Sequence, residues 1–378
     1  MGDAQGRSNA VGSNGLRLII AGGGTGGHIF PGIAVAKELM KRYPASEVLF
    51  VTGGKRIESD LLRDAGISRV PIMVEGIKGR GLINILKAMI KLPCGFFQSL
   101  LIIKKFSPDL VLGVGGYSAG PVCLAARIMG KKTAIHEQNS FPGVTNRLLS
   151  RVVDRVFISF KESAFRFPDG KTCFTGNPIR EGFMPVKEGV KQGAKGFTIL
   201  VTGGSQGASA INAAVIEALK MLKDRGSAPR IIHQTGQADF EKVLREYREK
   251  GLEGDVKPFI KDMPEAYRQA DVFIGRAGAG TVFELAALGK PSILIPYPHA
   301  ADDHQTANAR MLADIGGARI ITQDKLNPVK LAEIITGFME DRASLEKMGE
   351  QAVKAARPDA AKDIADQIEE MIGTRIKA

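Results

Sequence analysis

The sequence predicts an α/β fold of two doubly wound domains, each built on a parallel sheet. Three observations support this prediction. Short runs of Val, Ile and Leu alternate with helical patterns, the alternation restarts near the middle of the chain, and glycine-rich loops follow strands in both halves. Continuous apolar strands followed by helices are typical of a parallel sheet covered on both faces. A chain of 378 residues is long enough for two such domains.

The first domain is expected at residues 16–180. Residues 1–15 are rich in Gly, Ser and Asn and lack the apolar core of a secretion signal, so we expect a flexible leader there. We expect a helix from about Pro31 and further helices between the later strands. The predicted strands are "LRLIIAG" at 16–22, "EVLFVTG" at 47–53, "VPIMV" at 70–74, "DLVLGVGG" at 109–116, "KTAIHEQN" at 132–139 and "RVFISF" at 155–160.

The second domain is expected at residues 196–356, after an aperiodic Pro-, Gly- and Lys-containing linker at 181–195. We expect a C-terminal helix at 357–378 to pack back on the first domain. The predicted strands of the second domain are "FTILVTGG" at 197–204, "RIIHQTG" at 230–236, "VKPFI" at 256–260, "DVFIGRAG" at 271–278, "PSILIPYP" at 291–298 and "ARIITQ" at 318–323.

The two domains repeat one pattern. A single offset of 180 residues places Gly24 on Gly204 and Gly27 on Gly207, with an apolar strand before and an amphipathic helix after each loop. This repeat predicts two Rossmann-like domains facing a cleft, with ligands bound at the carboxyl ends of the strands.

Three glycine loops lie at predicted strand-to-helix turns, where backbone N–H groups and the helix dipole favour an anion. They are the first loop at 22–27, the second at 113–116 and the third at 203–207. The first loop has the Gly-x-Gly-x-x-Gly spacing of dinucleotide sites, but Thr52-Gly53 replaces the acidic residue that would hold the ribose. His28 stands where a Walker A loop needs Lys, so we expect a phosphate site of another kind.

Cysteine and histidine spacing argues against disulfides and metal. Cys94, Cys123 and Cys173 are widely separated and odd in number, which favours a reducing compartment. The five histidines lie singly at strand ends or in loops and form no HExxH-type cluster, so no metal site is expected. Each taken alone is better explained as a satisfied loop histidine, except His28, which a phosphate loop would place beside the reactants.

The net charge of +12 is compatible with nucleic acid, an anionic membrane or acidic substrates, and half of it lies between residues 76 and 108. That stretch has no acidic residue, and its apolar residues recur at helical spacing. They could contact a membrane surface, or they could pack into the core with the lysines solvated. The uncharged run at 92–103 is too short to cross a bilayer. The candidate membrane contacts are Lys78, Arg80, Leu82, Ile85, Leu86, Lys87, Met89, Ile90, Lys91, Phe96 and Phe97.

A second polar region spans residues 276–309. Glu284 follows a small-residue loop by about one helical turn, where a carboxylate can accept both hydroxyls of a ribose. "DDHQ" at 302–305 offers acid and amide groups suited to a sugar. Taken singly, Glu284 is better explained as a helix surface charge, and Asp302 or Asp303 as a helix N-cap.

Together these stretches resemble glycosyltransferase family 28, whose members have a fold of the GT-B type. The matching motifs run in order from about residue 16 to 356: "GGGTGGHIFPGIAVA", "GVGGYSAGP", "HEQNSFPGVTNRLL", "GNPIR", "GGSQGASAIN", "HQTG", "RAGAGTVFELAALGKPSILIPYP" and "HQTANA". The resemblance implies a hexosyltransferase of peptidoglycan synthesis. It would move N-acetylglucosamine, with inversion, from UDP-N-acetylglucosamine to the C4 hydroxyl of undecaprenyl-pyrophosphoryl-N-acetylmuramyl-pentapeptide (lipid I), which gives lipid II.

The resemblance also assigns residues to two substrates. It implies that the first and second glycine loops hold the acceptor's pyrophosphate, and that Glu284 holds the donor's ribose and Ile260 its uracil. The acceptor residues would be Gly24, His28, Gly115, Gly116, Tyr117 and Ser118. The donor residues would be Thr25, Gly26, Gly27, Asn139, Arg180, Ser205, Ile260, Ala279, Gly280, Thr281, Val282, Phe283, Glu284 and Gln305.

Inversion needs a base that takes the proton of the acceptor hydroxyl. His28 is the first candidate, because its loop is expected to line the cleft and its ordinary pKa lies near 6.5. Glu137 is the second. Arg180 and a helix N-terminus at Ser205 would stabilise the leaving diphosphate, so we expect neither cofactor nor catalytic metal.

The expected location is the cytoplasmic face of the bacterial inner membrane, as a peripheral protein without a nucleic-acid partner. Other cell-wall enzymes are a further expected class of partner. The alternatives are a UDP-sugar transferase with another lipid or soluble acceptor, a UDP-sugar epimerase, and a non-catalytic scaffold that binds nucleotide sugars. Product analysis with and without acceptor separates them.

Overall fold

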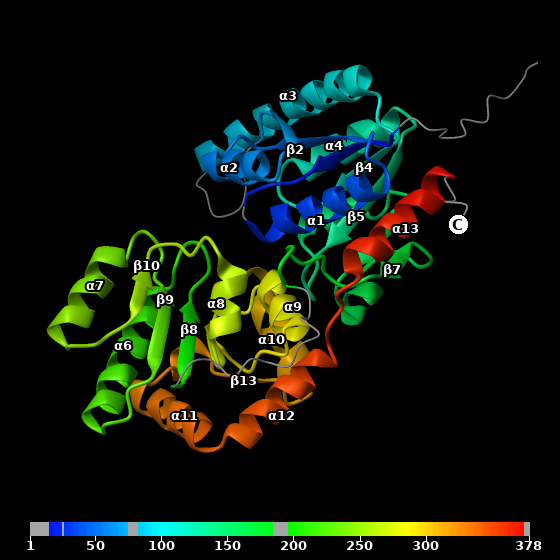
Figure 1. The fold of residues 1–378 in the computed structure, drawn as a ribbon. Coiled ribbons are helices and arrows are strands. Elements are labelled where there is room, and N and C mark those ends of the chain that lie inside the picture. Colours follow the sequence, from blue (N-terminus) through cyan, green and yellow to red (C-terminus); the bar gives the residue numbers. More distant parts are fainter. Residues whose placement is uncertain (1–14, 25, 75–81, 184–195, 374–378) are drawn as a thin grey trace, which may run out of the picture. The chain divides into compact units, whose positions relative to one another are not determined.

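The computed structural model describes residues 15–24, 26–74, 82–183 and 196–373, without the side chains of Ile57 and of residues 82–92. Most of the expected leader and linker, as well as Thr25, Lys78 and Arg80, lie outside these ranges. The chain forms two compact units (Figure 1). The first unit comprises residues 1–138, 142–180 and 359–378, and the second comprises 139–141 and 181–358.

The first unit is built on a seven-stranded sheet in the order β3-β2-β1-β4-β5-β6-β7. All neighbouring strands are parallel, and β1 lies between β2 and β4, where the strand order reverses. Such a switch point is where open α/β sheets bind ligands. The strands are β1 (Arg17–Ala21), β2 (Glu47–Thr52), β3 (Ser68–Pro71), β4 (Leu110–Gly113), β5 (Lys132–Glu137), β6 (Arg155–Ile158) and β7 (Thr172–Phe174).

Helices cover both faces of this sheet, because successive side chains of a strand point to opposite faces. Leu18 and Ile20 pack with residues of α1 and α13, whereas Ile19 and Ala21 belong to the core formed with α3, α4 and α5. The helices are α1 (Gly26–Arg42), α2 (Arg56–Asp64), α3 (Leu82–Phe106), α4 (Ala119–Ile128), α5 (Val144–Leu149), the 3-10 helix η1 (Lys161–Arg166) and α13 (Ala360–Ile372).

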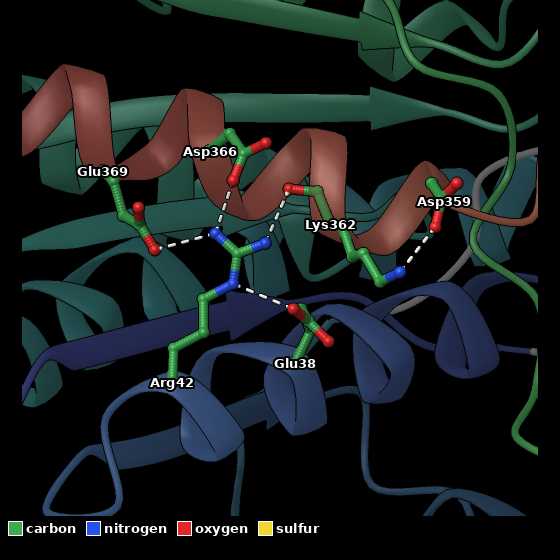
Figure 2. Close-up of polar contacts among 6 residues, drawn as sticks. All are labelled: Glu38, Arg42, Asp359, Lys362, Asp366 and Glu369. Carbon is green, nitrogen blue, oxygen red and sulfur yellow. Dashed lines mark hydrogen bonds and ion pairs between the residues drawn. The ribbon is translucent and has the colours of Figure 1, made fainter. Parts of the chain in front are cut away.

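The C-terminal helix α13 packs against α1 in the first unit (Figure 1). Ile364 and Ile368 are fully buried in the same core as Leu18. Figure 2 shows the polar half of this contact, in which the Arg42 guanidinium lies 2.8 Å from Glu38 Oε1 and 2.9 Å from Glu369 Oε1 and also contacts Asp366. Burial lowers the pKa of Arg42, but these hydrogen bonds outweigh it and raise the pKa, so the guanidinium stays charged.

The second unit has a six-stranded parallel sheet in the order β10-β9-β8-β11-β12-β13. Its strands are β8 (Thr198–Thr202), β9 (Arg230–Gln234), β10 (Asp255–Lys257), β11 (Val272–Gly275), β12 (Ser292–Leu294) and β13 (Ala318–Ile320). Its helices are α6 (Ser209–Asp224), α7 (Phe240–Glu249), α8 (Met263–Gln269), α9 (Ala279–Ala287), α10 (His304–Ala313), α11 (Pro328–Glu340) and α12 (Arg342–Val353), with 3-10 turns η2 (Ala301–Asp303) and η3 (Gln323–Lys325).

Two helix starts differ from the sequence-based expectation, and a third helix has the expected N-cap residue without its capping hydrogen bond. The helix expected from Pro31 begins at Gly26, so the last two residues of the first glycine loop, Gly26 and Gly27, open it and His28 is its third residue. The helix expected to begin at Ser205 begins at Ser209, which places Ser205 in the preceding turn. Asp303 occupies the N-cap position of α10 in a left-handed conformation, and its carboxylate accepts from the Thr306 hydroxyl rather than from a backbone N–H.

Candidate functional site

The first glycine loop is held by a carboxylate that the sequence analysis missed. Glu58, in the first turn of α2, is buried, and its Oε1 accepts a 2.6 Å hydrogen bond from the Gly24 N–H. Its Oε2 accepts from the Lys55 N–H at 2.9 Å. Gly24 has a φ of +98°, which favours glycine. Since its N–H is occupied, Gly24 shapes the loop, and the N–H groups suited to an anion are those from Gly26 onward in the first turn of α1.

The second glycine loop packs directly against the first. Gly115 has a φ of +93°, and a Cβ there would lie 2.7 Å from His28 Nδ1. A Cβ on Gly116 would lie 2.4 Å from the Gly23 carbonyl oxygen. The two residues that follow this loop differ in exposure. Tyr117 is exposed, and Ser118 is buried with a hydroxyl that has no hydrogen-bond partner among the described residues. Glycine is therefore required where the imidazole of His28 lies against the backbone.

The two candidate bases have different surroundings. His28 is partly exposed, and its Nδ1 lies 3.1 Å from Oε1 of Gln138, which follows β5. Glu137 is buried, and its Oε2 accepts from the Gly143 N–H at 3.1 Å and from Asn146 Nδ2 at 2.8 Å. These bonds tie the loop after β5 to the start of α5. The Glu137 carboxylate is thus already occupied by two hydrogen bonds, whereas the His28 ring is partly open to solvent.

Asn139 belongs to the second unit, although it lies only three residues after His136 of the first. Its Oδ1 accepts a hydrogen bond from Nδ2 of Asn308, a buried residue of α10, at 3.2 Å. Asn308 Oδ1 in turn accepts from the Ser140 N–H at 3.0 Å. Asn308 lies in the "HQTANA" motif, and nothing in the sequence pattern indicates this role for it.

The third glycine loop is organised by Gln234, another residue that was not singled out. Its Nε2 donates to the Gly204 carbonyl at 2.9 Å and to Thr202 Oγ1 at 3.0 Å. Its Oε1 accepts from the Ile260 N–H at 2.9 Å. One buried amide therefore connects the loop that carries the exposed Ser205 to the segment that carries Ile260.

The remaining predicted donor residues lie around the starts of α9 and α10. Gly278 precedes α9 with extended backbone and without a side-chain cap, so the first N–H groups of the helix receive no capping side chain. A Cβ on Gly280 would meet no atom within 4 Å, and Glu284 is buried. Gln305, in the first turn of α10, accepts a 3.0 Å hydrogen bond from the Tyr297 N–H. The predicted residues of α9 are Ala279, Gly280, Thr281, Val282, Phe283 and Glu284.

The structure thus gathers the predicted residues into two sets, one in each unit. Arg180 belongs to the first unit, where its guanidinium lies 4.7 Å from the centre of the Phe30 ring on α1. The first set also contains Gly24, Gly26, Gly27, His28, Gly115, Gly116, Tyr117, Ser118 and Glu137. The second contains Asn139, Ser205, Ile260, Ala279, Gly280, Thr281, Val282, Phe283, Glu284 and Gln305. Within the described ranges, no three His, Cys, Asp or Glu side chains cluster as metal ligands would.

The predicted membrane contacts divide differently. Leu82, Ile85, Leu86, Lys87, Met89, Ile90 and Lys91 lie on α3, but their side chains are outside the description. Phe96 packs against the core of the first unit, contrary to the expectation that it faces a membrane. Phe97 is 64% exposed. No helix in the described part of the chain is long and apolar enough to cross a membrane.

A cavity of about 560 Å³ lies at the edge of the second sheet where the strands begin, opposite the edge that carries the predicted donor residues. Thr198, Arg230 and Asp255, the first residues of β8, β9 and β10, contribute to its lining. Because ligands of such folds bind at the carboxyl ends of the strands, we do not assign the cavity to the candidate site.

Two histidines are structural rather than exposed. His136 and His233 are buried in β5 and β9, and burial lowers the pKa of each to about 4. For His136, a hydrogen bond to the Gly176 carbonyl partly offsets this by raising the pKa, and the electrostatic influence of the neighbouring His28 lowers it slightly. His233 Nδ1 lies 3.0 Å from the Tyr247 hydroxyl and its Nε2 lies 3.1 Å from Asn212 Oδ1. Both are therefore neutral in the folded protein at neutral pH.

Acid is expected to destabilise the protein through these two histidines. An unfolded histidine titrates near 6.5, so between pH 6.5 and about 4 the unfolded state binds more protons and stability falls as the pH is lowered. Each buried histidine then accounts for roughly 3 kcal/mol of that loss. We expect His233→Gln to flatten the dependence of Tm on pH, and the exposed His299→Gln to leave it unchanged. If Tm depended equally on pH in the two variants, His233 would not be a source of the acid destabilisation.

Comparisons with known proteins match nearly the whole chain. The model of the glycosyltransferase family 28 N-terminal domain matches residues 18–158, and that of the family 28 C-terminal domain matches residues 198–364. A protein of Syntrophus aciditrophicus named UDP-N-acetylglucosamine--N-acetylmuramyl-(pentapeptide) pyrophosphoryl-undecaprenol N-acetylglucosamine transferase is 47% identical over 357 residues, 94% of this chain and 99% of that protein. The Geobacter sulfurreducens protein of the same name is 47% identical, covering 93% of this chain and 98% of that one.

Solved structures also match nearly the whole chain. The crystal structure of Acinetobacter baumannii MurG has a TM-score of 0.74 and 37% sequence identity, and the match covers 94% of this chain and 99% of that one. A UDP-GlcNAc 2-epimerase from Neisseria meningitidis bound to UDP-GlcNAc has a TM-score of 0.67 at 15% identity, which is a likeness of fold alone.

Proposed function

Since the chain belongs to glycosyltransferase family 28, we propose that it catalyses the reaction for which its relatives are named. It transfers N-acetylglucosamine from UDP-N-acetylglucosamine to lipid I, which gives lipid II, and it is therefore a hexosyltransferase of peptidoglycan synthesis. The observation that carries this conclusion is identity of 44–47% to transferases of this name over more than nine-tenths of the chain. The glycine loops and α9 contain the motifs that the family resemblance assigns to the substrates.

For the donor, we propose that UDP-N-acetylglucosamine binds the second unit. The uncapped start of α9 supplies N–H groups and a positive dipole end for the diphosphate. Ser205 is exposed in the third glycine loop, and Gln234 connects this loop to Ile260, the proposed uracil contact. Glu284 holds the ribose hydroxyls, and Asn139, Gln305 and the other predicted donor residues of the second unit complete this part of the site.

For the acceptor, we propose that the pyrophosphate of lipid I binds the first unit at the start of α1. The N–H groups of its first turn and the adjoining second glycine loop, with Tyr117 and Ser118, are the proposed contacts. Ser118 supports this assignment because its buried hydroxyl has no hydrogen-bond partner among the described residues.

The transfer step needs a base and a stabilised leaving group. We propose that His28 takes the proton from the acceptor's C4 hydroxyl as that oxygen bonds to C1 of N-acetylglucosamine. The bond from C1 to the UDP oxygen breaks at the opposite face, and UDP leaves as the diphosphate anion. Arg180 and backbone N–H groups supply the compensating positive charge in this proposal, and we expect no cofactor or catalytic metal to take part.

For location, we propose peripheral association with the cytoplasmic face of the inner membrane through the first unit. Phe97 and Leu101, one turn apart on α3, are 64% and 69% exposed, and Ile128 on the adjoining α4 is 65% exposed. Lys104 and Lys105 are exposed at the end of α3 and suit an anionic surface. Contact with lipid, like docking of other cell-wall enzymes, stays a prediction.

Removing the exposed apolar pair of α3 is expected to weaken vesicle binding. A Phe or Leu side chain transferred from water to lipid contributes about 1.5–3 kcal/mol, so Phe97→Ser with Leu101→Ser should reduce binding to anionic vesicles by at least ~10-fold. Co-sedimentation measures this change. Phe259→Ser in the second unit, also at an exposed phenylalanine, is the matched control and should bind as wild type does. Unchanged binding of the double variant would refute contact through this part of α3.

The proposed reaction is tested directly with UDP-N-acetylglucosamine and a short-chain lipid I analogue. We expect a disaccharide product and release of UDP, both at a rate that EDTA leaves unchanged. Folded protein that binds UDP but forms no disaccharide would overturn the proposal. Conversion of the nucleotide sugar without acceptor would identify an epimerase instead, and product with a different acceptor would identify another transferase.

A further inference from the structure

Gln138 lies between two histidines at the carboxyl end of β5. Its side chain is buried, and its Nε2 lies 2.9 Å from the Val114 carbonyl oxygen and 3.2 Å from that of His136. Nε2 also lies 3.0 Å from His136 Nδ1, and Oε1 lies 3.1 Å from His28 Nδ1. Gln138 therefore joins the loops that follow β1, β4 and β5.

The surroundings of this amide determine which of its ends faces His28. Carbonyl oxygens only accept hydrogen bonds, so the NH₂ end must face Val114 and His136. The oxygen end then faces His28, and an amide oxygen also only accepts. Nδ1 of His28 must accordingly carry a proton, because two acceptors cannot form a hydrogen bond with each other.

The other histidine fits the same assignment. His136 Nδ1 accepts from Gln138, so its proton lies on Nε2, which is 3.3 Å from the Gly176 carbonyl oxygen and 3.1 Å from Ser159 Oγ. The Ser159 hydroxyl donates to the Glu137 carbonyl at 2.9 Å and can thus accept from His136. With these two tautomers each of the contacts pairs a donor with an acceptor, the two N–H bonds of Gln138 being shared among three acceptors, whereas the other tautomer of either ring would set two like groups against each other.

We propose that Gln138 is a positioning residue that holds neutral His28 in the Nδ1–H tautomer and leaves Nε2 as the proton-accepting nitrogen. This inference rests on the proposed function of His28 as the base. The proton of the C4 hydroxyl passes to Nε2 as the oxygen's electron pair forms the bond to C1 and UDP departs. The imidazolium that results keeps its hydrogen bond from Nδ1–H to the Gln138 oxygen. Gly115 packs against the ring and limits its rotation.

The tautomer can be observed without turnover. We would record ¹⁵N spectra of the full chain labelled at histidine, at a pH where the ring is neutral, and assign the His28 signals by their loss in His28→Gln. The expected spectrum has a protonated Nδ1 and an unprotonated Nε2. The reverse pattern in the wild type would overturn the proposal, whether or not the protein is a transferase.

Two replacements of Gln138 distinguish loss of the His28 orientation from a general loss of structure. Gln138→Met and Gln138→Glu both lose the donated hydrogen bonds, but only Glu keeps an oxygen that accepts from His28 Nδ1–H. For Gln138→Met we expect a mixture of the two neutral tautomers of His28. We also expect kcat to be roughly tenfold to a hundredfold lower than in the wild type, and KM for the donor to stay within about twofold. Glu should preserve the tautomer and have a higher kcat than Met when His28 is neutral.

Ser159→Ala is the control, because it removes a buried hydrogen bond on the far side of His136 and leaves Gln138 in place. It should keep the wild-type tautomer and kcat. Wild-type tautomer and kcat in Gln138→Met, or an equal loss in Ser159→Ala, would refute the positioning role. If the Met variant does not fold, the wild-type spectrum decides. A wild type that shows the expected tautomer but forms no disaccharide would refute the proposed function alone.

Discussion

Replacing His28 with alanine is expected to lower kcat by ~10² or more and to leave UDP affinity nearly unchanged. The proposed role of the side chain is to remove a proton from the acceptor, and the proposed UDP contacts lie mainly in the second unit. A methyl group at position 28 also loses the partner of Gln138 Oε1, which lies 3.1 Å from the ring in the wild type. Steady-state kinetics with a short-chain lipid I analogue and calorimetric titration with UDP measure the two quantities.

The matched control is His299→Ala, at an exposed histidine of the second unit for which no role in substrate binding is proposed. Its kcat should equal that of the wild type. Near-normal turnover of His28→Ala would move the base to another residue. Glu137 would then be the next candidate, although its carboxylate accepts hydrogen bonds from Gly143 and Asn146.

Replacing Ile368 with alanine is expected to lower the free energy of unfolding by about 2–5 kcal/mol. Ile368 of α13 is fully buried among core residues of the first unit, including Leu18 and Ile20 of the central strand. Truncation to alanine removes apolar contacts and leaves a cavity beside α1. Denaturant titration of the full chain, followed by a probe in the first unit, measures the loss.

Ile128→Ala provides the matched control for this change. It deletes the same atoms from a side chain in the first unit that is 65% exposed, so its effect should stay within about 0.5 kcal/mol. Similar losses in the two variants would contradict a core role for α13.

The fold could be predicted because its signals are local and repeated. Apolar runs followed by helical periods indicate parallel sheets, and the repeat of Gly24 at Gly204 indicates two of them. Both positions have positive φ in the structure, as expected for loops that need glycine. The expected start of α1 lies five residues too late, because proline favours the first turn of a helix, whereas Pro31 lies within α1.

The candidate site could be predicted only in part, for a physical reason. His28 stands out because it follows a glycine loop, but its partner Gln138 is 110 residues away, and no periodicity encodes that hydrogen bond. The contact of Glu58 with Gly24 spans 34 residues and is equally hidden. His136 and His233 also end apolar strands, and only the packed structure separates these buried rings from the partly exposed His28.

The return of α13 to the first unit has a consequence for biosynthesis. During translation, residues 16–180 leave the ribosome well before residues 360–372, so the apolar surface of α1 lacks its cover while the whole second unit is being made. The unit encoded first is therefore completed last. Nascent chains that stall before residue 360 would expose this surface, and we expect chaperones to recognise them there.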